Sequence, residues 1–191
     1  MATKKRKNRN KKYILSVIAT VAVLALIYLF TYLLKQSINS VSQDLDGPYD
    51  VVSVIDGDTI IVKSDDGDIH VRLIGIDTPE SVASDGYKEN TPEGDKASEY
   101  TQNLLEGNSV YLEYDKELTD SYQRTLAYVY LPDGSTMVNE LLIQNGYART
   151  MEIAPNTKYA ERFAAQELIA KGQKAGFWGT GFFNEKDGNS N

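Results

Sequence analysis

Two short acidic motifs carry the side chains whose types and spacing could do chemistry. Asp56-Gly57-Asp58 and Asp77-Thr78-Pro79-Glu80 each follow an apolar run of the chain. Carboxylates that converge at the ends of neighbouring strands provide oxygen ligands, which favour Ca²⁺ or Mg²⁺ over transition metals. Each motif also has a structural alternative. Asp-Gly-Asp is common in turns, and an Asp-x-x-Glu pair with Pro between can cap a helix.

Two arginines accompany the acids. Arg72 lies within the apolar run 71–74, five residues before Asp77, and Arg124 precedes the apolar run 126–131. A charge in an apolar setting is costly unless it is paired, so one alternative is that each arginine only balances an acid. Together with a bound metal and a carboxylate, however, two arginines can support attack by water on a phosphodiester. The metal polarises an oxygen, the arginines bind it and the carboxylate orients water.

Histidine and cysteine chemistry is excluded by composition. The chain has one histidine, His70, and no cysteine, so it cannot build a zinc site of the usual His/Cys type. Cleavage of RNA by a pair of histidines is excluded for the same reason. A Ser-His-Asp triad would have to use His70, whose place within an apolar run predicts an ordinary strand residue.

The N-terminal part of the chain predicts a membrane anchor. Residues 1–12 hold seven of the 20 basic residues and no acid, and residues 13–34 carry no charge. A helix of this length is about 33 Å long, which suffices to cross a bilayer core. The positive-inside rule then places 1–12 in the cytoplasm and the rest of the chain outside the cell. The alternative is a signal segment that is cleaved near Ser40-Val41-Ser42, which would release the domain.

The remainder of the chain predicts an α+β domain at residues 49–181, between a linker at 35–48 and a polar tail at 182–191. Runs rich in β-branched residues alternate with turn signals, and later segments show helical spacing. Short strands followed by packing helices favour a five-stranded Greek-key barrel. The expected strands are 51–55, 59–62, 69–76, 110–114 and 126–131, and the expected helices are 95–105, 137–144 and 158–171.

Three ordered motifs resemble the thermonuclease (staphylococcal nuclease) family. They are Ile55-Asp56-Gly57-Asp58-Thr59, the segment 72–80 (RLIGIDTPE), and Tyr122-Gln123-Arg124 followed by Leu126-Ala127-Tyr128. The resemblance extends from about residue 50 to Trp178. It implies an OB-fold barrel with three helices. It also implies Ca²⁺-dependent hydrolysis of DNA and RNA that leaves 3′-phosphate ends.

The resemblance also implies roles for individual residues. Asp58, Asp77 and the backbone carbonyl of Thr78 would hold Ca²⁺, and Glu80 would be the general base. The catalytic arginines Arg72 and Arg124 would stabilise the charge that develops on the phosphoryl group. Tyr122 would contact a phosphate of the substrate. We expect the protein to be a monomer that acts on DNA and RNA and is attached to the membrane by its N-terminal helix.

Some positions depart from the family pattern. Ser121 stands where a phosphate-binding lysine is common, and residues 150–154 lack the tyrosines that stack on bases. After residue 12 the chain keeps 13 basic and all 27 acidic residues, which weakens attraction to a polyanion. Two alternatives follow, a non-catalytic OB-fold module that binds nucleic acid or protein, and a membrane-bound scaffold with an acidic surface.

Overall fold

The computed structural model describes residues 20–31, 44–81 and 91–187, which belong to two separate units. In the first unit, Met1–Gln43, residues 20–31 form a helix. No helix among the described residues is long and apolar enough to cross a membrane. The expected span 13–34 extends on both sides beyond 20–31, and its other residues lie outside the described ones, as do residues 1–12.

The second unit, Asp44–Asn191, is built on a closed five-stranded barrel in the order β1-β2-β3-β6-β5. All neighbouring pairs are antiparallel except β3 and β6, which are parallel. The expected five-stranded OB-fold barrel is therefore confirmed. Its strands are β1 (Asp46–Asp56), β2 (Thr59–Ser64), β3 (Gly67–Leu73), β5 (Ser109–Glu113) and β6 (Thr125–Tyr130).

The barrel is filled by apolar side chains that alternate along its strands, as strand geometry requires. These side chains are fully buried and include Ile60, Val62, Val71, Leu73, Val110, Leu112 and Val129. The first strand begins at Asp46, earlier than expected, so residues 46–48 of the expected linker belong to β1.

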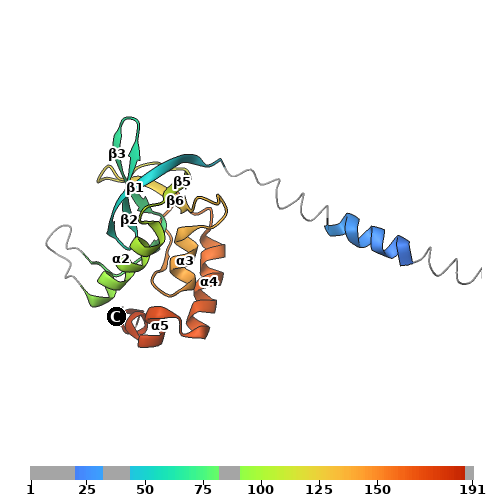
Figure 1. Ribbon diagram of the computed structural model, residues 1–191. Coiled ribbons are helices and arrows are strands. Elements are labelled where there is room, and N and C mark those ends of the chain that lie inside the picture. The colour runs from blue at the N-terminus through green and yellow to red at the C-terminus, as the bar shows by residue number, and fades with distance from the viewer. Residues whose placement is uncertain (1–19, 32–43, 82–90, 188–191) are drawn as a thin grey trace, which may run out of the picture. The chain divides into compact units, whose positions relative to one another are not determined.

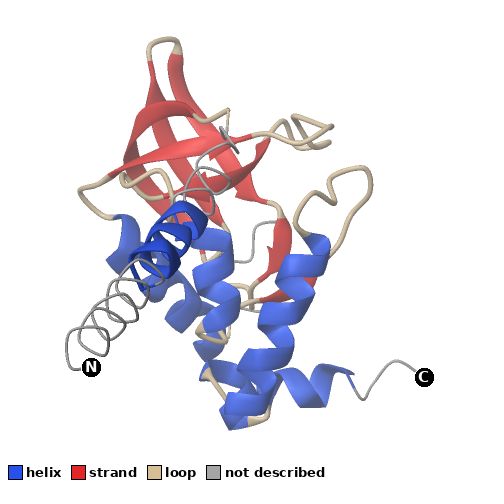
Figure 2. Ribbon diagram, turned by 90° about the vertical axis from the view of Figure 1, so that its right-hand side faces the viewer, coloured by secondary structure: helices blue, strands red, loops and turns tan. Residues whose placement is uncertain are grey.

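The helices of the second unit gather at one end of the barrel, away from the β2–β3 hairpin (Figures 1 and 2). The three expected helices are present, and the described part of the unit adds two short ones at its C-terminal end. In order they are α2 (Pro92–Leu105), α3 (Val138–Gln144), α4 (Ala160–Gln173), α5 (Gly176–Thr180) and α6 (Phe182–Asp187).

The expected polar tail at 182–191 is wrong for its first half. Phe182–Asp187 form α6, and the Phe183 ring is buried against Trp178, with ring centroids 4.8 Å apart. Phe183, near the start of the expected tail, packs on the domain and fixes this helix there. Residues 188–191 lie outside the described ones.

The expected strand 69–76 is divided in two at Gly75. Gly75 has φ +79°, and a Cβ there would lie 2.7 Å from the Phe163 ring of α4. The chain turns at this glycine, leaves the barrel and continues as β4 (Gly75–Asp77). There it pairs with β7 (Arg149–Met151), a strand that the sequence pattern does not predict. This second sheet carries Asp77.

Candidate active site

Asp58, just before β2, lies against Arg72 on β3. Asp58 lies in the β1–β2 turn, and the following residue, Thr59, is the register partner of Arg72 on β3. The Asp58 carboxylate forms an ion pair with the Arg72 guanidinium. Its other oxygen, Oδ2, accepts a hydrogen bond from the Thr78 backbone N–H at 3.1 Å. This bond brings the β1–β2 turn against the segment that begins with Asp77.

Arg72 is held deep in the site. Its side chain is only 14% exposed, its Nη2 donates to the Ile76 carbonyl at 3.3 Å, and the same atom lies 4.0 Å from Asp77 Oδ1. Burial, followed by repulsion from Arg124, lowers the pKa of Arg72 to about 10. The guanidinium therefore remains charged at neutral pH.

Glu80 is anchored through its backbone to the start of α2. Both the N–H and the hydroxyl of Thr91 donate to the Glu80 carbonyl, at 3.1 and 3.3 Å. Thr91 also caps α2, since its hydroxyl accepts from Gly94 N–H at 3.0 Å. A Cβ on Gly94 would lie 2.0 Å from the Glu80 carbonyl oxygen, so only glycine permits this approach. Residues 78–80 are not helical, which excludes the helix-cap alternative for Asp77 and Glu80.

Asp56 connects the β1–β2 turn to the segment after Glu80. Its Oδ1 accepts hydrogen bonds from the Gly57 N–H at 2.7 Å, from the N–H and hydroxyl of Ser81, and from Ser98 on α2. Burial raises the pKa of this carboxyl, and the bonds from Gly57 and Ser81 oppose that rise. Asp56, which also lines the cleft, therefore joins the β1–β2 turn to Ser81 and to α2.

Arg124 is placed by Asp120 at the end of a tight loop. Asp120 Oδ2 accepts from Arg124 Nε at 2.8 Å, and Oδ1 accepts from the backbone N–H groups of Tyr122 and Arg124 at 2.9 Å. Gln123 between them has φ +64°, in the left-handed region, where glycine is favoured. Burial alone would raise the pKa of Asp120, but the bonds from Arg124 lower it overall.

Tyr122 projects from this loop into solvent. It is 77% exposed, and the Arg124 guanidinium carbon lies 5.5 Å from its ring centroid. An exposed aromatic ring beside a cation can contact an incoming phosphate or base.

A single cleft of about 710 Å³ collects these side chains. Six of the seven residues expected at the site line it: Asp58, Arg72, Asp77, Glu80, Tyr122 and Arg124. The seventh, Thr78, is buried, and its hydroxyl has no hydrogen-bond partner. The structure therefore brings together residues from three separated segments, and their chemical roles stay predictions.

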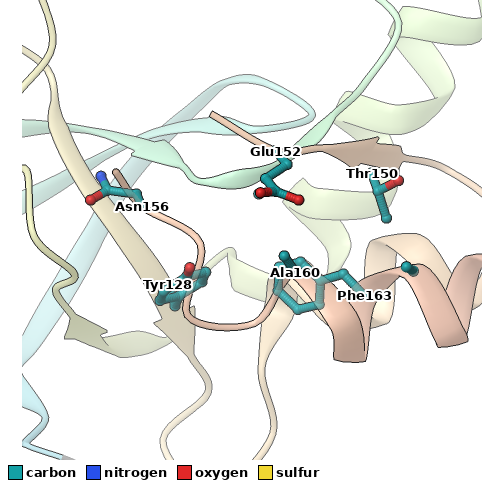
Figure 3. Close-up of a pocket in the computed structure, with 8 residues that line it drawn as sticks. Tyr128, Thr150, Glu152, Asn156, Ala160 and Phe163 are labelled. Carbon is teal, nitrogen blue, oxygen red and sulfur yellow. The ribbon is translucent and has the colours of Figure 1, made fainter. Parts of the chain in front are cut away.

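A smaller cavity of about 70 Å³ lies on the other side of β7, against α4. Figure 3 shows Thr150, Glu152 and Phe163 around it. Met151 and Ile153, by contrast, line the large cleft. Side chains of residues 150–153 thus point alternately to the small cavity and to the large cleft, as in an extended chain. This segment therefore separates the two cavities.

The acids of the cleft fit a hard cation by the type of their donor atoms. Asp58, Asp77 and Glu80 present carboxylate oxygens to one space, and the buried Thr78 hydroxyl beside them lacks a partner. No group of three or more His, Cys, Asp or Glu side chains suited to a metal occurs among the described residues. A Ca²⁺ ion here would thus depend on two carboxylates and a backbone carbonyl, with water completing its six to eight ligands.

Sequence reasoning missed two residues that contact the site, Asp120 and Arg149. Asp120 precedes Arg124 by four residues in a polar loop, where an acid is unremarkable. Arg149 Nε donates to Asp77 Oδ2 at 3.1 Å, across 72 residues of chain. Only the pairing of β4 with β7 reveals that contact.

Comparison with known proteins identifies the class to which this fold and site belong. The family model described as "Staphylococcal nuclease homologue" matches residues 70–180. This chain belongs to that family, and the expectation of a nuclease enzyme is confirmed at that level.

Individual relatives agree with this assignment. A protein named thermonuclease from Staphylococcus hyicus is 46% identical over 133 residues, which are 68% of this chain and 75% of that protein. A thermonuclease from Staphylococcus intermedius is 41% identical over 169 residues, 83% of this chain and 96% of the relative. Endonuclease YncB of Bacillus subtilis (strain 168) is 39% identical over 126 residues, 65% of this chain and 58% of the relative.

Proposed function

We propose that this protein hydrolyses phosphodiester bonds in DNA and RNA in a Ca²⁺-dependent reaction that leaves 3′-phosphate ends. The observation that carries the proposal is the single cleft shared by Arg72, Arg124, Glu80 and the acids Asp58 and Asp77. A cleft in which two arginines lie beside carboxylates can bind one phosphate group and activate water next to it.

The residues divide the reaction among them. The Glu80 carboxylate takes a proton from a water molecule, whose oxygen attacks phosphorus. Arg72 and Arg124 donate hydrogen bonds to the phosphoryl oxygens, on which negative charge grows in the transition state. The bond from phosphorus to the 5′ oxygen breaks, which leaves a 3′-phosphate on one fragment of the strand. The departing 5′ oxygen takes up a proton from solvent and becomes the 5′-hydroxyl of the other fragment.

Asp58, Asp77 and the Thr78 carbonyl are the ligands that would hold Ca²⁺. When bound, the cation supplies a Lewis acid that polarises a phosphoryl oxygen. Tyr122, exposed at the mouth of the cleft, is the contact for a neighbouring phosphate.

A cleavage assay on residues 44–191, which form a compact unit, tests this function. Single-stranded DNA and RNA are incubated with Ca²⁺ or with a chelator, and the product ends are identified by their need for phosphatase before polymerase extension. We expect cleavage only with Ca²⁺, and a loss of at least roughly 10³-fold in the Arg72→Ala, Glu80→Ala double variant.

The matched control is Arg162→Ala, because Arg162 pairs with Glu140 and does not line the cleft. Thermal unfolding of each variant verifies that it is folded. Absence of cleavage with Ca²⁺ would favour the non-catalytic binding module. Equal cleavage by the double variant would refute the catalytic roles of Arg72 and Glu80.

The proposed location is the cell membrane, with residues 1–12 in the cytoplasm and the nuclease domain outside. It is supported by the uncharged stretch 13–34 and the seven basic residues before it. The full chain should sediment with membranes, resist extraction by carbonate, and lose its nuclease domain when intact spheroplasts are treated with protease. A soluble product whose N-terminus follows residue 42 would instead establish cleavage and secretion.

The domain is proposed to act as a monomer, since all the proposed site residues come from one chain. Light scattering on residues 44–191 tests this, and a dimer mass would contradict it.

A further inference from the structure

Arg149 faces Asp77 across the small sheet formed by β4 and β7. The two residues are register partners in this antiparallel pair, so their side chains lie on the same face. Arg149 Nε donates to Asp77 Oδ2 at 3.1 Å, and the two side chains are 33% and 23% exposed. Such a partly shielded, charge-assisted bond is more directional than an ion pair on the open surface.

The strand that carries Arg149 is itself fixed to α4. The Thr150 backbone N–H donates to Glu167 Oε2 at 2.7 Å, and the Thr150 hydroxyl donates to the same oxygen. Glu167 is nearly buried and also pairs with Lys171, one helical turn further along, at 2.7 Å. Arg149 is therefore attached to a rigid helix and not to a free loop.

The two oxygens of Asp77 thus have different surroundings. Oδ2 accepts from Arg149, whereas Oδ1 lies 4.0 Å from Arg72 Nη2, and Asp77 lines the cleft. A carboxylate held at one oxygen cannot turn freely about its last side-chain torsion. We propose that Arg149 is a positioning residue that keeps Asp77 Oδ1 directed into the cleft, toward Arg72 and the place where Asp77 would hold Ca²⁺. This role rests on the proposed nuclease function and gives Arg149 no contact with substrate.

Two neutral substitutions separate positioning from charge. Arg149→Gln places an N–H donor as many bonds from Cα as the arginine Nε, whereas Arg149→Met has similar reach and no donor. Both variants remove the same positive charge, so any difference between them reports the hydrogen bond. Arg162→Met on α4 is the control, because it breaks a comparable pair, with Glu140, outside the cleft.

We expect Arg149→Met to lower kcat by roughly 5- to 20-fold with KM changed less than about 2-fold, and Arg149→Gln to recover most of kcat. In calorimetric titrations without nucleic acid, Ca²⁺ should bind Arg149→Met more weakly than Arg149→Gln by a similar factor. The Arg162→Met control should match the wild type in both measurements.

The contact itself has an independent readout. In ¹⁵N NMR spectra, the Arg149 Nε–Hε signal should be protected from exchange with water, and Asp77→Ala should abolish that protection. Equal kcat and equal Ca²⁺ binding of the Gln and Met variants would overturn the positioning role, as would an unprotected Nε–Hε signal. A wild-type chain that cleaves nothing would instead refute the proposed function, and the NMR result would still decide whether Arg149 holds Asp77.

Discussion

Asp120 supports Arg124 with both of its carboxylate oxygens. One oxygen accepts the Arg124 Nε–H, and the other accepts two backbone N–H groups of the loop that carries Tyr122 and Arg124. Asp120 therefore fixes the direction of the Arg124 guanidinium. The loop belongs to no helix or strand, and Gln123 within it has a left-handed backbone, so these hydrogen bonds hold its conformation.

Asp120→Asn should therefore reduce activity by roughly tenfold and destabilise the domain by about 1–2 kcal/mol at pH 7. The pKa of Asp120 lies below its ordinary value of 3.8, so its ionised form stabilises the fold above that pH. This stabilisation is lost as the pH falls through the lower pKa of the folded state. Urea unfolding of wild type and variant between pH 7 and pH 2 should show their difference shrinking below about pH 4.

The exposed Asp66 in the β2–β3 turn provides the control. Asp66→Asn should leave both activity and the free energy of unfolding at pH 7 unchanged. A constant difference between Asp120→Asn and wild type down to pH 2 would contradict the proposed charge-assisted bond.

At the scale of elements, the start of α2 determines where Glu80 lies. Thr91 caps the helix and also binds the Glu80 carbonyl, and Gly94 allows the helix backbone to approach that carbonyl. The proposed base is thus attached through its main chain to a helix N-terminus. Its side chain remains directed into the cleft.

Gly94→Ala should separate α2 from Glu80, because its Cβ would lie 2.0 Å from the Glu80 carbonyl oxygen. We expect a loss of about 2–4 kcal/mol in the free energy of unfolding and a fall in kcat larger than any rise in KM. Chemical denaturation and steady-state kinetics measure the two effects.

Gly172→Ala on α4 is the matched control, since a Cβ there meets no atom within 4 Å. This substitution should leave kcat unchanged and stabilise the domain by up to about 1 kcal/mol through helix propensity. If Gly94→Ala were as well tolerated as Gly172→Ala, the contact between α2 and Glu80 would not position the base.

At the scale of the whole molecule, the acidic charge of the domain opposes its proposed substrate. After residue 12 the chain has 13 basic and 27 acidic residues, and Glu117 and Asp120 line the cleft beside Arg72 and Arg124. Few phosphates can then be neutralised at once, so little counterion release assists binding.

Binding of a single-stranded oligonucleotide should therefore depend only weakly on salt. With two arginines in contact with phosphate, log Kd should rise with log salt concentration at a slope of about 1.4. Fluorescence anisotropy with the Glu80→Gln variant, which should bind without cleaving, measures this slope between 50 and 200 mM salt. A slope above about 4 would reveal a basic surface that the cleft does not account for.

The sequence by itself determined the barrel, its helices and the residues expected at the site. Apolar alternation, glycine turns and helical spacing are local signals, and each of the three short motifs contains one or more of the expected acids or arginines. Local signals did not predict the turn at Gly75, which lies against Phe163, or the helix at Phe183, which packs on Trp178.

Only the tertiary structure decided how the site residues are held. Asp77 meets Arg149 through the pairing of β4 with β7, and Glu80 meets Gly94 through the docking of α2. Each contact joins two segments that are far apart in the sequence. No local pattern predicts such a contact, because it depends on where the two segments lie in the folded domain. The short motifs thus determine which functional groups the site contains, whereas the fold determines how these groups are oriented.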